Sequence, residues 1–244
     1  MKKNILENLI NFTLSTELIP LILCLFFFKK INSRELKVFF IYAIIQVVFI
    51  SSGALSIYIL KSYKLYILLL RAHLIFEFIF TSLFFKYLFN KKIFNVITSL
   101  TIPVFIVYNL VDVKIDGLSY FDNKSTLIEF LFFIVIIIFY FFELIKLNVA
   151  TPIYRKISFW ICVGLFFYFT GNFFYILLVE NSRNESVSVK NQLIFVYSIV
   201  TIIKNLILGG AFFAGNEGDD NPNNFISFPS DIDLDAITPN NKLQ

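Results

Sequence analysis

Charged side chains are scarce in this sequence. Only 16% of its 244 residues are Asp, Glu, Lys or Arg, whereas 58% are hydrophobic and 33 are phenylalanine. A soluble domain of this length cannot hide so much apolar surface in a single core. The composition therefore excludes an ordinary soluble protein and indicates that lipid is the solvent for most of the chain.

The residues that build metal and catalytic sites are also few. The chain has one histidine, His73, and its two cysteines, Cys24 and Cys162, lie in apolar runs without metal-ligand spacing. Walker, HExxH and GxSxG motifs are absent, and paired aspartates occur only near the C-terminus. We therefore expect no metal, no cofactor and no enzyme activity, and we interpret both cysteines as buried thiols. Because the basic residues are scattered beside apolar runs, nucleic acid is not an expected partner.

Long apolar runs are what the sequence has in abundance. Seven stretches reach the roughly 20 residues that are needed to cross about 30 Å of hydrocarbon. They cover residues 5–28, 38–60, 65–89, 93–111, 126–145, 157–179 and 192–213. Because a lipid-exposed segment must satisfy its backbone polar groups internally, each run is expected to be a helix. The predicted fold class is all-α, a polytopic membrane protein with a seven-transmembrane helix bundle over residues 1–213.

The first apolar run resembles a signal peptide only at its start. Lys2 and Lys3 precede it, but it ends at Phe28 without a small-residue cleavage site. We expect it to remain as a membrane anchor.

Basic residues in the short loops indicate the orientation. Nine of them fall on one side of the membrane and eight on the other, but the densest group directly follows the first span. This group consists of Lys29, Lys30, Arg34 and Lys37. We therefore place the N-terminus outside and the C-terminus in the cytoplasm. Abundant Lys, Asn, Ile and Phe beside scarce Gly, Ala and Met are typical of an AT-rich bacterial genome, so the expected location is the bacterial inner (cytoplasmic) membrane.

The composition changes abruptly after the seventh span. Residues 214–244 contain six acidic residues and three prolines, with Lys242 as the only base. Such a segment cannot form a core, and we predict a disordered acidic cytoplasmic tail. Within it, residues 230–235 alternate acidic and apolar side chains, a pattern that can dock as an added strand on a cytosolic partner. The alternative is a solubilising tail without a ligand.

Lys204 is the residue that most needs an explanation, because it lies inside the seventh span. A charge in that position costs about 2.5 to 3.5 kcal/mol on the insertion scale unless it is paired or hydrated. Helical spacing places Tyr197 and Thr201 on the same face, and Asn205 lies beside them. This polar face is expected to point towards other helices.

The third span carries a second polar stripe, in which His73, Glu77 and Thr81 are spaced four residues apart. At 1.5 Å per residue, Glu77 and Lys204 both lie about 18 Å from the outer ends of their helices, and Glu17 of the first span lies at a similar depth. Lys204 can therefore pair with Glu77 or with Glu17, and either pair could merely fix the packing. For His73 we expect a hydrogen bond to Glu77, with a pH-sensing pair as the alternative.

Other polar residues in the spans have simpler interpretations. Glu129 and Glu143 lie about 21 Å apart along the fifth span, so we assign them to opposite interfaces. Arg71 is expected to snorkel to the outer surface. The sixth span has small and aromatic residues on one face, which predicts a close helix contact or a ring-walled cavity. This face consists of Trp160, Gly164, Tyr168, Gly171 and Tyr175.

Short motifs in the last two spans resemble a known group of proteins. They are Pro152, Ser158-Phe159-Trp160-Ile161, Gly164, Tyr168, Gly171-Asn172 and Ile202-Ile203-Lys204-Asn205. In these motifs residues 1–213 resemble the uncharacterised seven-helix integral membrane proteins of bacteroidetes-type bacteria that are associated with sensor histidine kinases. The resemblance implies a sensory module that works with a separate kinase through the cytoplasmic loops and the tail.

The polar residues in the spans allow three functions. The leading expectation is a sensory or signalling protein that detects a ligand, protons or the state of the membrane near Lys204, Glu77 and His73. The alternative is a small transporter or proton-coupled carrier, in which Glu17, Glu77, Lys204 and Glu143 form a charge pathway. A third, less favoured hypothesis is a rhodopsin-like protein in which Lys204 binds retinal and Trp160 and Tyr168 surround it.

Overall fold

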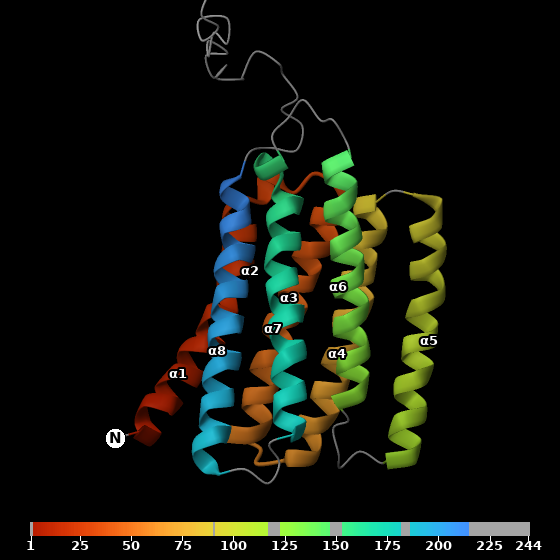
Figure 1. Ribbon diagram of the computed structural model, residues 1–244. Coiled ribbons are helices and arrows are strands. Elements are labelled where there is room, and N and C mark those ends of the chain that lie inside the picture. Colours follow the sequence, from red (N-terminus) through yellow and green to blue (C-terminus); the bar gives the residue numbers. More distant parts are fainter. Residues whose placement is uncertain (1, 90, 117–122, 147–152, 182–185, 215–244) are drawn as a thin grey trace, which may run out of the picture.

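The chain folds into a bundle of long helices that run in alternating directions (Figure 1). The fold is a computed structural model that describes residues 2–89, 91–116, 123–146, 153–181 and 186–214. The helices are α1 (Lys2–Thr16), α2 (Leu18–Phe26), α3 (Arg34–Tyr58), α4 (Tyr63–Phe89), α5 (Lys92–Asp116), α6 (Asn123–Lys146), α7 (Ile157–Asn181) and α8 (Val187–Gly210). Three 3₁₀ turns are η1 (Phe28–Lys30), η2 (Ile153–Arg155) and η3 (Ala211–Phe213). The described residues contain no strand.

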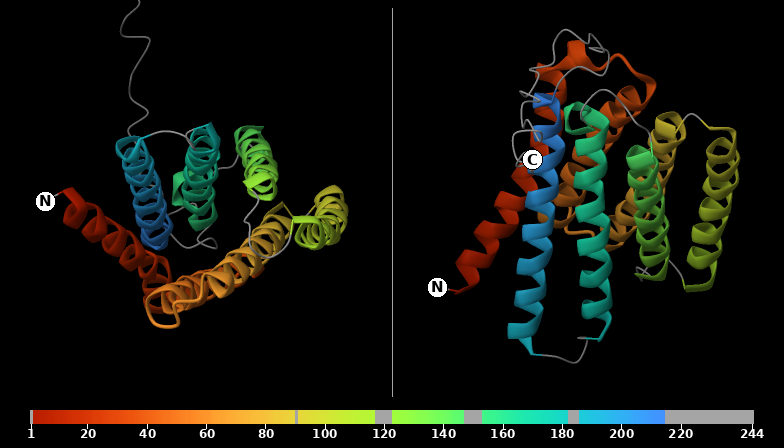
Figure 2. Two further views of the ribbon diagram at one scale, coloured as in Figure 1. Left: turned by 90° about the horizontal axis from the view of Figure 1, so that it is seen from below. Right: turned by 45° about the horizontal axis from the view of Figure 1, so that its top comes forward.

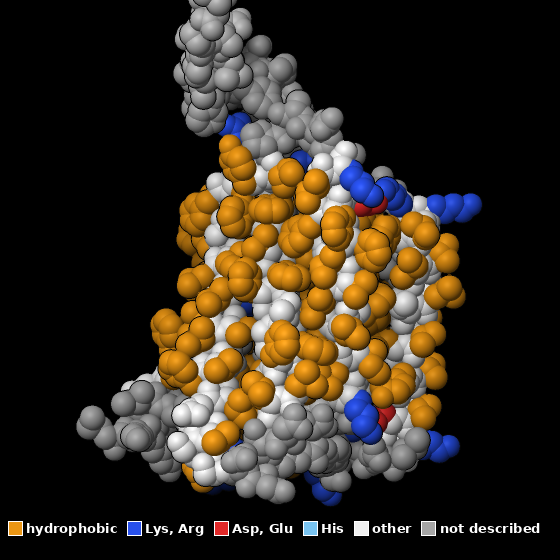
Figure 3. All heavy atoms as spheres, in the orientation of Figure 1, with side chains coloured by type: hydrophobic (Ala, Val, Ile, Leu, Met, Phe, Trp, Pro, Cys, Tyr) orange, Lys and Arg blue, Asp and Glu red, His pale blue; other side chains and the backbone are white. Residues whose placement is uncertain are grey.

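Seven helical segments of the described chain are long and apolar enough to cross a membrane. The predicted all-α, polytopic seven-helix class is therefore confirmed. Figure 3 shows the reason in space: apolar side chains cover the flanks of the bundle, while lysine and arginine gather towards its two ends. The predicted acidic tail lies outside the described residues, apart from Ala214.

Six of the seven segments close a ring. Following the contacts, α2 packs on α3, α3 on α4, α4 on α6, α6 on α7, α7 on α8, and α8 on both α1 and α2. The view from below in Figure 2 shows α6, α7 and α8 in one row, with α3 and α4 opposite. Helix α5 stands outside this ring and packs against α4. Side chains that face the centre of the ring are thereby withdrawn from lipid.

Phenylalanine rings fill much of the space between the helices. Phe78 of α4 stacks on Phe105 of α5 with centroids 3.9 Å apart, and Phe133 of α6 stacks on Phe169 of α7 at 4.9 Å. The phenylalanine content is therefore partly structural, because such ring pairs add packing energy beyond the area that they bury. Cys24 and Cys162 are fully buried, as expected, and neither forms a disulfide within the described residues.

The first span is divided into α1 and α2 at Glu17. Pro20 accounts for the division, because its ring nitrogen cannot donate the helical hydrogen bond to the carbonyl of Thr16. In Figure 1, α1 diverges from the bundle while α2 continues along α8. The bend places the carboxyl group of Glu17 beside α8.

The loop predicted between residues 112 and 125 is shorter than expected. Helix α5 continues to Asp116 and α6 already begins at Asn123. The extension places Asp112 within α5, where it forms an ion pair with Arg71 of α4. A contact with another helix thus overrides the polar local composition from which a loop was predicted.

Candidate functional site

Lys204 lies in the interior of the ring with only 2% of its surface exposed. It belongs to the buried face of α8, together with Ser198, Thr201 and Asn205. Its ammonium nitrogen donates to both carboxylate oxygens of Glu17, each 3.0 Å away. A buried charge is tolerated when a counter-charge and hydrogen bonds replace water, and this geometry supplies both. Of the two partners left open by the sequence, Glu17 is the one in contact.

A neutral hydrogen bond accompanies the ion pair. The amide of Asn205 donates to the hydroxyl of Thr16 at 3.0 Å. Thr16 ends α1 and Asn205 follows Lys204 on α8, so two successive residues of each segment meet at the helix break. Both contacts join the break in the first span to α8.

Tyr168 of α7 connects Lys204 to the second charged group. The Lys204 nitrogen lies 4.6 Å from the centroid of the Tyr168 ring, within the range of a cation–π interaction. The hydroxyl of the same side chain donates to Glu77 at 3.4 Å. Tyr168 therefore contacts both Lys204 and Glu77, and these two residues do not pair directly among the described contacts.

Glu77 is held by donors from two neighbouring helices. Besides Tyr168, the hydroxyl of Tyr42 and the amide of Gln46, both on α3, donate to it at 3.2 and 3.3 Å. Neutral donors thus replace the water that the carboxyl group loses on burial. Neither Tyr42 nor Gln46 was selected from the sequence, although their spacing of four residues is an i, i+4 polar pair in an apolar span.

The expected hydrogen bond from His73 to Glu77 is wrong. His73 Nε2 lies 2.7 Å from Gln46 Oε1, and because this oxygen can only accept, His73 is the donor. The amide nitrogen of Gln46 in turn donates to Glu77, so Gln46 bridges the two residues. The imidazole also meets the ring of Phe49 edge-on. Spacing along α4 correctly places His73 and Glu77 on one stripe, but the nearest donors to Glu77 belong to α3.

Glu129 of α6 is the least compensated group in the ring. It is 0% exposed, and within the described part of the chain neither carboxyl oxygen has a hydrogen-bond partner. It lies close enough to Glu77 for the two groups to interact electrostatically. Glu129 is therefore enclosed by protein, and its expected position at a membrane interface stays a prediction. The burial of Glu129 could not be predicted from the sequence. The residues around it are apolar without a clear helical period, so no one face of the helix stands out as the buried one.

Further polar groups in the ring also lack hydrogen-bond partners among the described residues. These are the hydroxyls of Thr81, Ser125 and Thr126 and the side-chain amide of Asn172. They come from α4, α6 and α7. A buried polar atom without a partner costs roughly 1 to 3 kcal/mol, so these groups are candidates to bind a polar species.

Two of the candidate residues lie away from this interior. The Trp160 indole nitrogen donates to the carbonyl of Tyr154 at 2.7 Å, and the side chain is 37% exposed. Tyr197 packs on Tyr175 with centroids 5.2 Å apart and is 40% exposed. Neither touches Lys204 in the contacts described, so Trp160 does not form the expected ring cage with Tyr168.

Arg71 does not snorkel to the surface. Its guanidinium donates to Asp112 at 2.6 Å, and both residues are buried. This second ion pair joins α4 to α5, outside the ring. It was missed because Asp112 was assigned to a loop.

Glycines allow the close approach of α7 and α8. A Cβ atom at Gly171 would lie 2.6 and 2.7 Å from the two methyl groups of Val200. Valine has one strongly preferred side-chain rotamer in a helix, so it cannot turn aside at low cost. The glycine face of α7 is thus a packing surface, one of the two interpretations that the sequence allowed.

This contact predicts a difference between two glycine substitutions. Gly171→Ala should lower the stability of the purified protein by about 1 to 3 kcal/mol because the added methyl overpacks the interface. Gly210→Ala is the control, since nothing lies within 4 Å of the position that its added methyl would take, and it should be neutral or slightly stabilising. Thermal unfolding in detergent measures both, and equal midpoints would contradict the packing described.

Comparison with protein families, curated proteins and solved structures found no match to this chain. The function proposed for the protein therefore rests on the geometry of the interior.

Proposed function

We propose that this protein is a multi-pass membrane sensor, whose receiving site is the polar interior around Lys204, Glu17 and Glu77. The observation that carries the proposal is the position of Lys204 on α8, which is followed by the short turn η3 and then by residues 215–244. A change in charge or occupancy at the Lys204–Glu17 pair therefore acts on the last membrane-spanning helix before the tail.

A second contact ties α8 to the first span near the tail. Lys30 of η1 donates to the carbonyls of Phe212 and Ala214 at 3.0 and 2.8 Å. This contact and the Lys204–Glu17 pair together hold the first span against the last helix and the turn η3 that follows it, at two levels. Weakening the Lys204–Glu17 pair would allow α2 and α8 to shift, and a helix shift is an established way to transmit a signal.

The proposed setting is the bacterial inner membrane, with the N-terminus outside and the tail in the cytoplasm. The tail and the loops on its side of the membrane then meet a cytosolic signalling protein, such as a histidine kinase. The acidic composition of residues 215–244 supports a docking role, because it offers charge and alternating apolar residues to a partner.

Affinity purification from native membranes tests this proposal. The full-length protein should retain a cytosolic signalling protein, identified by mass spectrometry, and a version ending at Gly215 should lose it. Lys30→Gln removes the hydrogen bonds from Lys30 to Phe212 and Ala214 but keeps the tail. This variant should change the amount of signalling protein that is recovered. An identical set of partners with and without the tail would refute the proposed output.

A proton-coupled carrier is the second candidate, and Glu129 favours it. A fully buried carboxyl group without a partner among the described residues is suited to bind and release a proton, because burying its charged form is costly. Glu77 extends this arrangement towards Lys204 through Tyr168. Retinal binding has less support, since Lys204 is engaged by Glu17 and Trp160 lies at the surface.

Glu129→Gln separates the carrier from the sensor. The amide has nearly the same shape, so the variant should fold in normal yield. In liposomes, a carrier should lose proton-coupled flux by at least tenfold, whereas partner binding by a sensor should survive. Glu143→Gln is the control, since Glu143 is partly exposed and pairs with Lys91 near a helix end. Wild-type liposomes without proton flux would exclude the carrier.

A further inference from the structure

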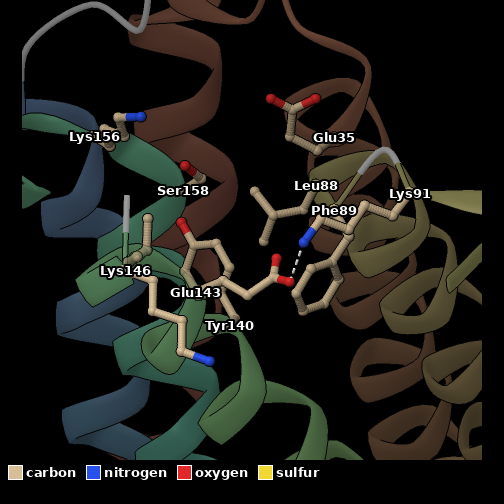
Figure 4. A pocket seen from close by; sticks show the side chains of 10 residues that line it. Glu35, Leu88, Phe89, Lys91, Tyr140, Glu143, Lys146, Lys156 and Ser158 are labelled. Atoms are coloured by element: carbon tan, nitrogen blue, oxygen red, sulfur yellow. Dashed lines mark hydrogen bonds and ion pairs between the residues drawn. The ribbon is translucent and has the colours of Figure 1, made fainter. Parts of the chain in front are cut away.

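A pocket of about 410 Å³ opens between helix ends, away from Lys204. Figure 4 shows its walls, which come from the start of α3, the end of α4, the end of α6 and the start of α7. In Figure 1 these ends share the upper side of the bundle with the end of α8. The ends of membrane-spanning helices lie near the boundary between hydrocarbon and headgroups, and the pocket opens at such ends.

Three lysines from three separate segments line this pocket. Lys91 follows α4, Lys146 ends α6 and Lys156 precedes α7. Lys91 is neutralised by an ion pair with Glu143. Within the described part of the chain, Lys146 and Lys156 have no ion-pair partner. Even with Glu35 also in the wall, the lining keeps a positive charge, with three cations against two carboxylates.

The backbone adds to this positive potential. Helix α7 begins at Ile157, and Lys156 and Ser158, on either side of that residue, both line the pocket. The first amide groups of a helix lack intrahelical acceptors and carry the positive end of its dipole. The N-terminus of α7 and the excess of lysines in the lining thus both favour an anionic group, such as phosphate, in this pocket.

The rest of the wall is apolar or aromatic. Leu88 and Phe89 of α4 and Tyr140 and Leu144 of α6 form this part of the lining. In Figure 3, charged side chains at the upper end of the bundle border the apolar surface directly below them. A ligand that presents an anion at the rim and an apolar portion towards the bilayer matches both parts of the pocket.

The geometry points to a binding site for a phosphate group presented at the membrane surface, as in the headgroup of an anionic phospholipid. Basic pockets between helix ends are a known means of holding such headgroups. A free phosphorylated solute offers the same group, and soluble probes distinguish the two sources. This inference does not depend on the proposed function, because no residue of the interior network takes part.

Lipid retention tests the site directly. The purified protein is reconstituted into vesicles of phosphatidylcholine, with or without phosphatidylglycerol, and retained lipids are measured by native mass spectrometry after extraction. The wild type should retain phosphatidylglycerol in preference to phosphatidylcholine. Lys146→Gln/Lys156→Gln should reduce that preference by roughly tenfold or more, because each lysine near the surface contributes to anion binding.

A matched variant controls for general surface charge. Lys37→Gln/Lys92→Gln removes the same charge from the same end of the bundle, at exposed residues outside the pocket lining. It should leave the preference nearly unchanged. An equal loss in both double variants would show a diffuse charge effect and overturn the site. Circular dichroism confirms that each variant keeps its helices.

Soluble probes separate a headgroup from a free ligand. Inorganic phosphate and glycerol phosphate are added to the protein in neutral detergent, and the thermal midpoint is recorded. A rise in the wild type that is lost in Lys146→Gln/Lys156→Gln, without any lipid preference, supports the phosphate site with a soluble source. If neither lipid preference nor a rise in midpoint is observed, the pocket does not bind phosphate groups and the inference fails.

Discussion

Lys204→Met should cost about 3 to 5 kcal/mol of stability, because it leaves the carboxylate of Glu17 buried without its counter-charge. The effect is expected as a lower yield of folded protein and a lower thermal midpoint in detergent. Adding Glu17→Gln should recover most of the loss, since the pair then becomes two neutral groups.

A second double variant makes this test specific. Lys204→Met with Glu77→Gln should not recover stability, because Glu77 receives its hydrogen bonds from Tyr42, Gln46 and Tyr168 and not from Lys204. Rescue by Glu77→Gln but not by Glu17→Gln would reverse the assignment. Equal damage in every variant would mean that Lys204 acts through packing alone.

Arg71→Met is expected to have a comparable effect, again about 3 to 5 kcal/mol, because Asp112 loses its counter-charge in a buried position. The consequence should centre on α5, which lies outside the ring and packs against α4. Arg71→Met with Asp112→Asn should restore much of the thermal midpoint. Lys114→Met, an exposed substitution two residues further along α5, is the control and should stay within about 0.5 kcal/mol of the wild type.

The test of the Arg71–Asp112 pair also bears on function. If Arg71→Met lowers the midpoint but leaves partner binding and flux intact, the pair serves only to dock α5. A loss of activity at normal stability would instead assign Arg71 and Asp112 to the signalling or transport path, and would contradict a purely structural role for the pair.

The spans were predictable because lipid imposes a simple requirement on the chain. About 20 apolar residues in a row have few stable alternatives to a membrane helix, so the seven runs are reproduced with only their ends shifted. The end of the fourth span was misjudged, since Asp112 reads as a loop residue until the buried Arg71 is known.

The candidate site was predictable only in part. Helical spacing identified the polar face of α8, and residue depth placed Glu17 within reach of Lys204. The same reasoning failed for His73, because an i, i+4 neighbour on one helix competes with donors from other helices that the spacing does not reveal. Gln46 takes both contacts, one with His73 and one with Glu77.

By itself, the sequence determined that this protein is a seven-helix membrane protein with charges buried in its spans, because hydrocarbon selects strongly for length, apolarity and helical backbone. Only the tertiary structure decided how those charges are compensated. Lys204 pairs with Glu17, Glu77 is held by neutral donors, and Glu129 is left without a partner among the described residues. The reason is that electrostatic and hydrogen-bond energies depend on separations of a few ångströms between different helices, which the order of residues along one helix does not specify.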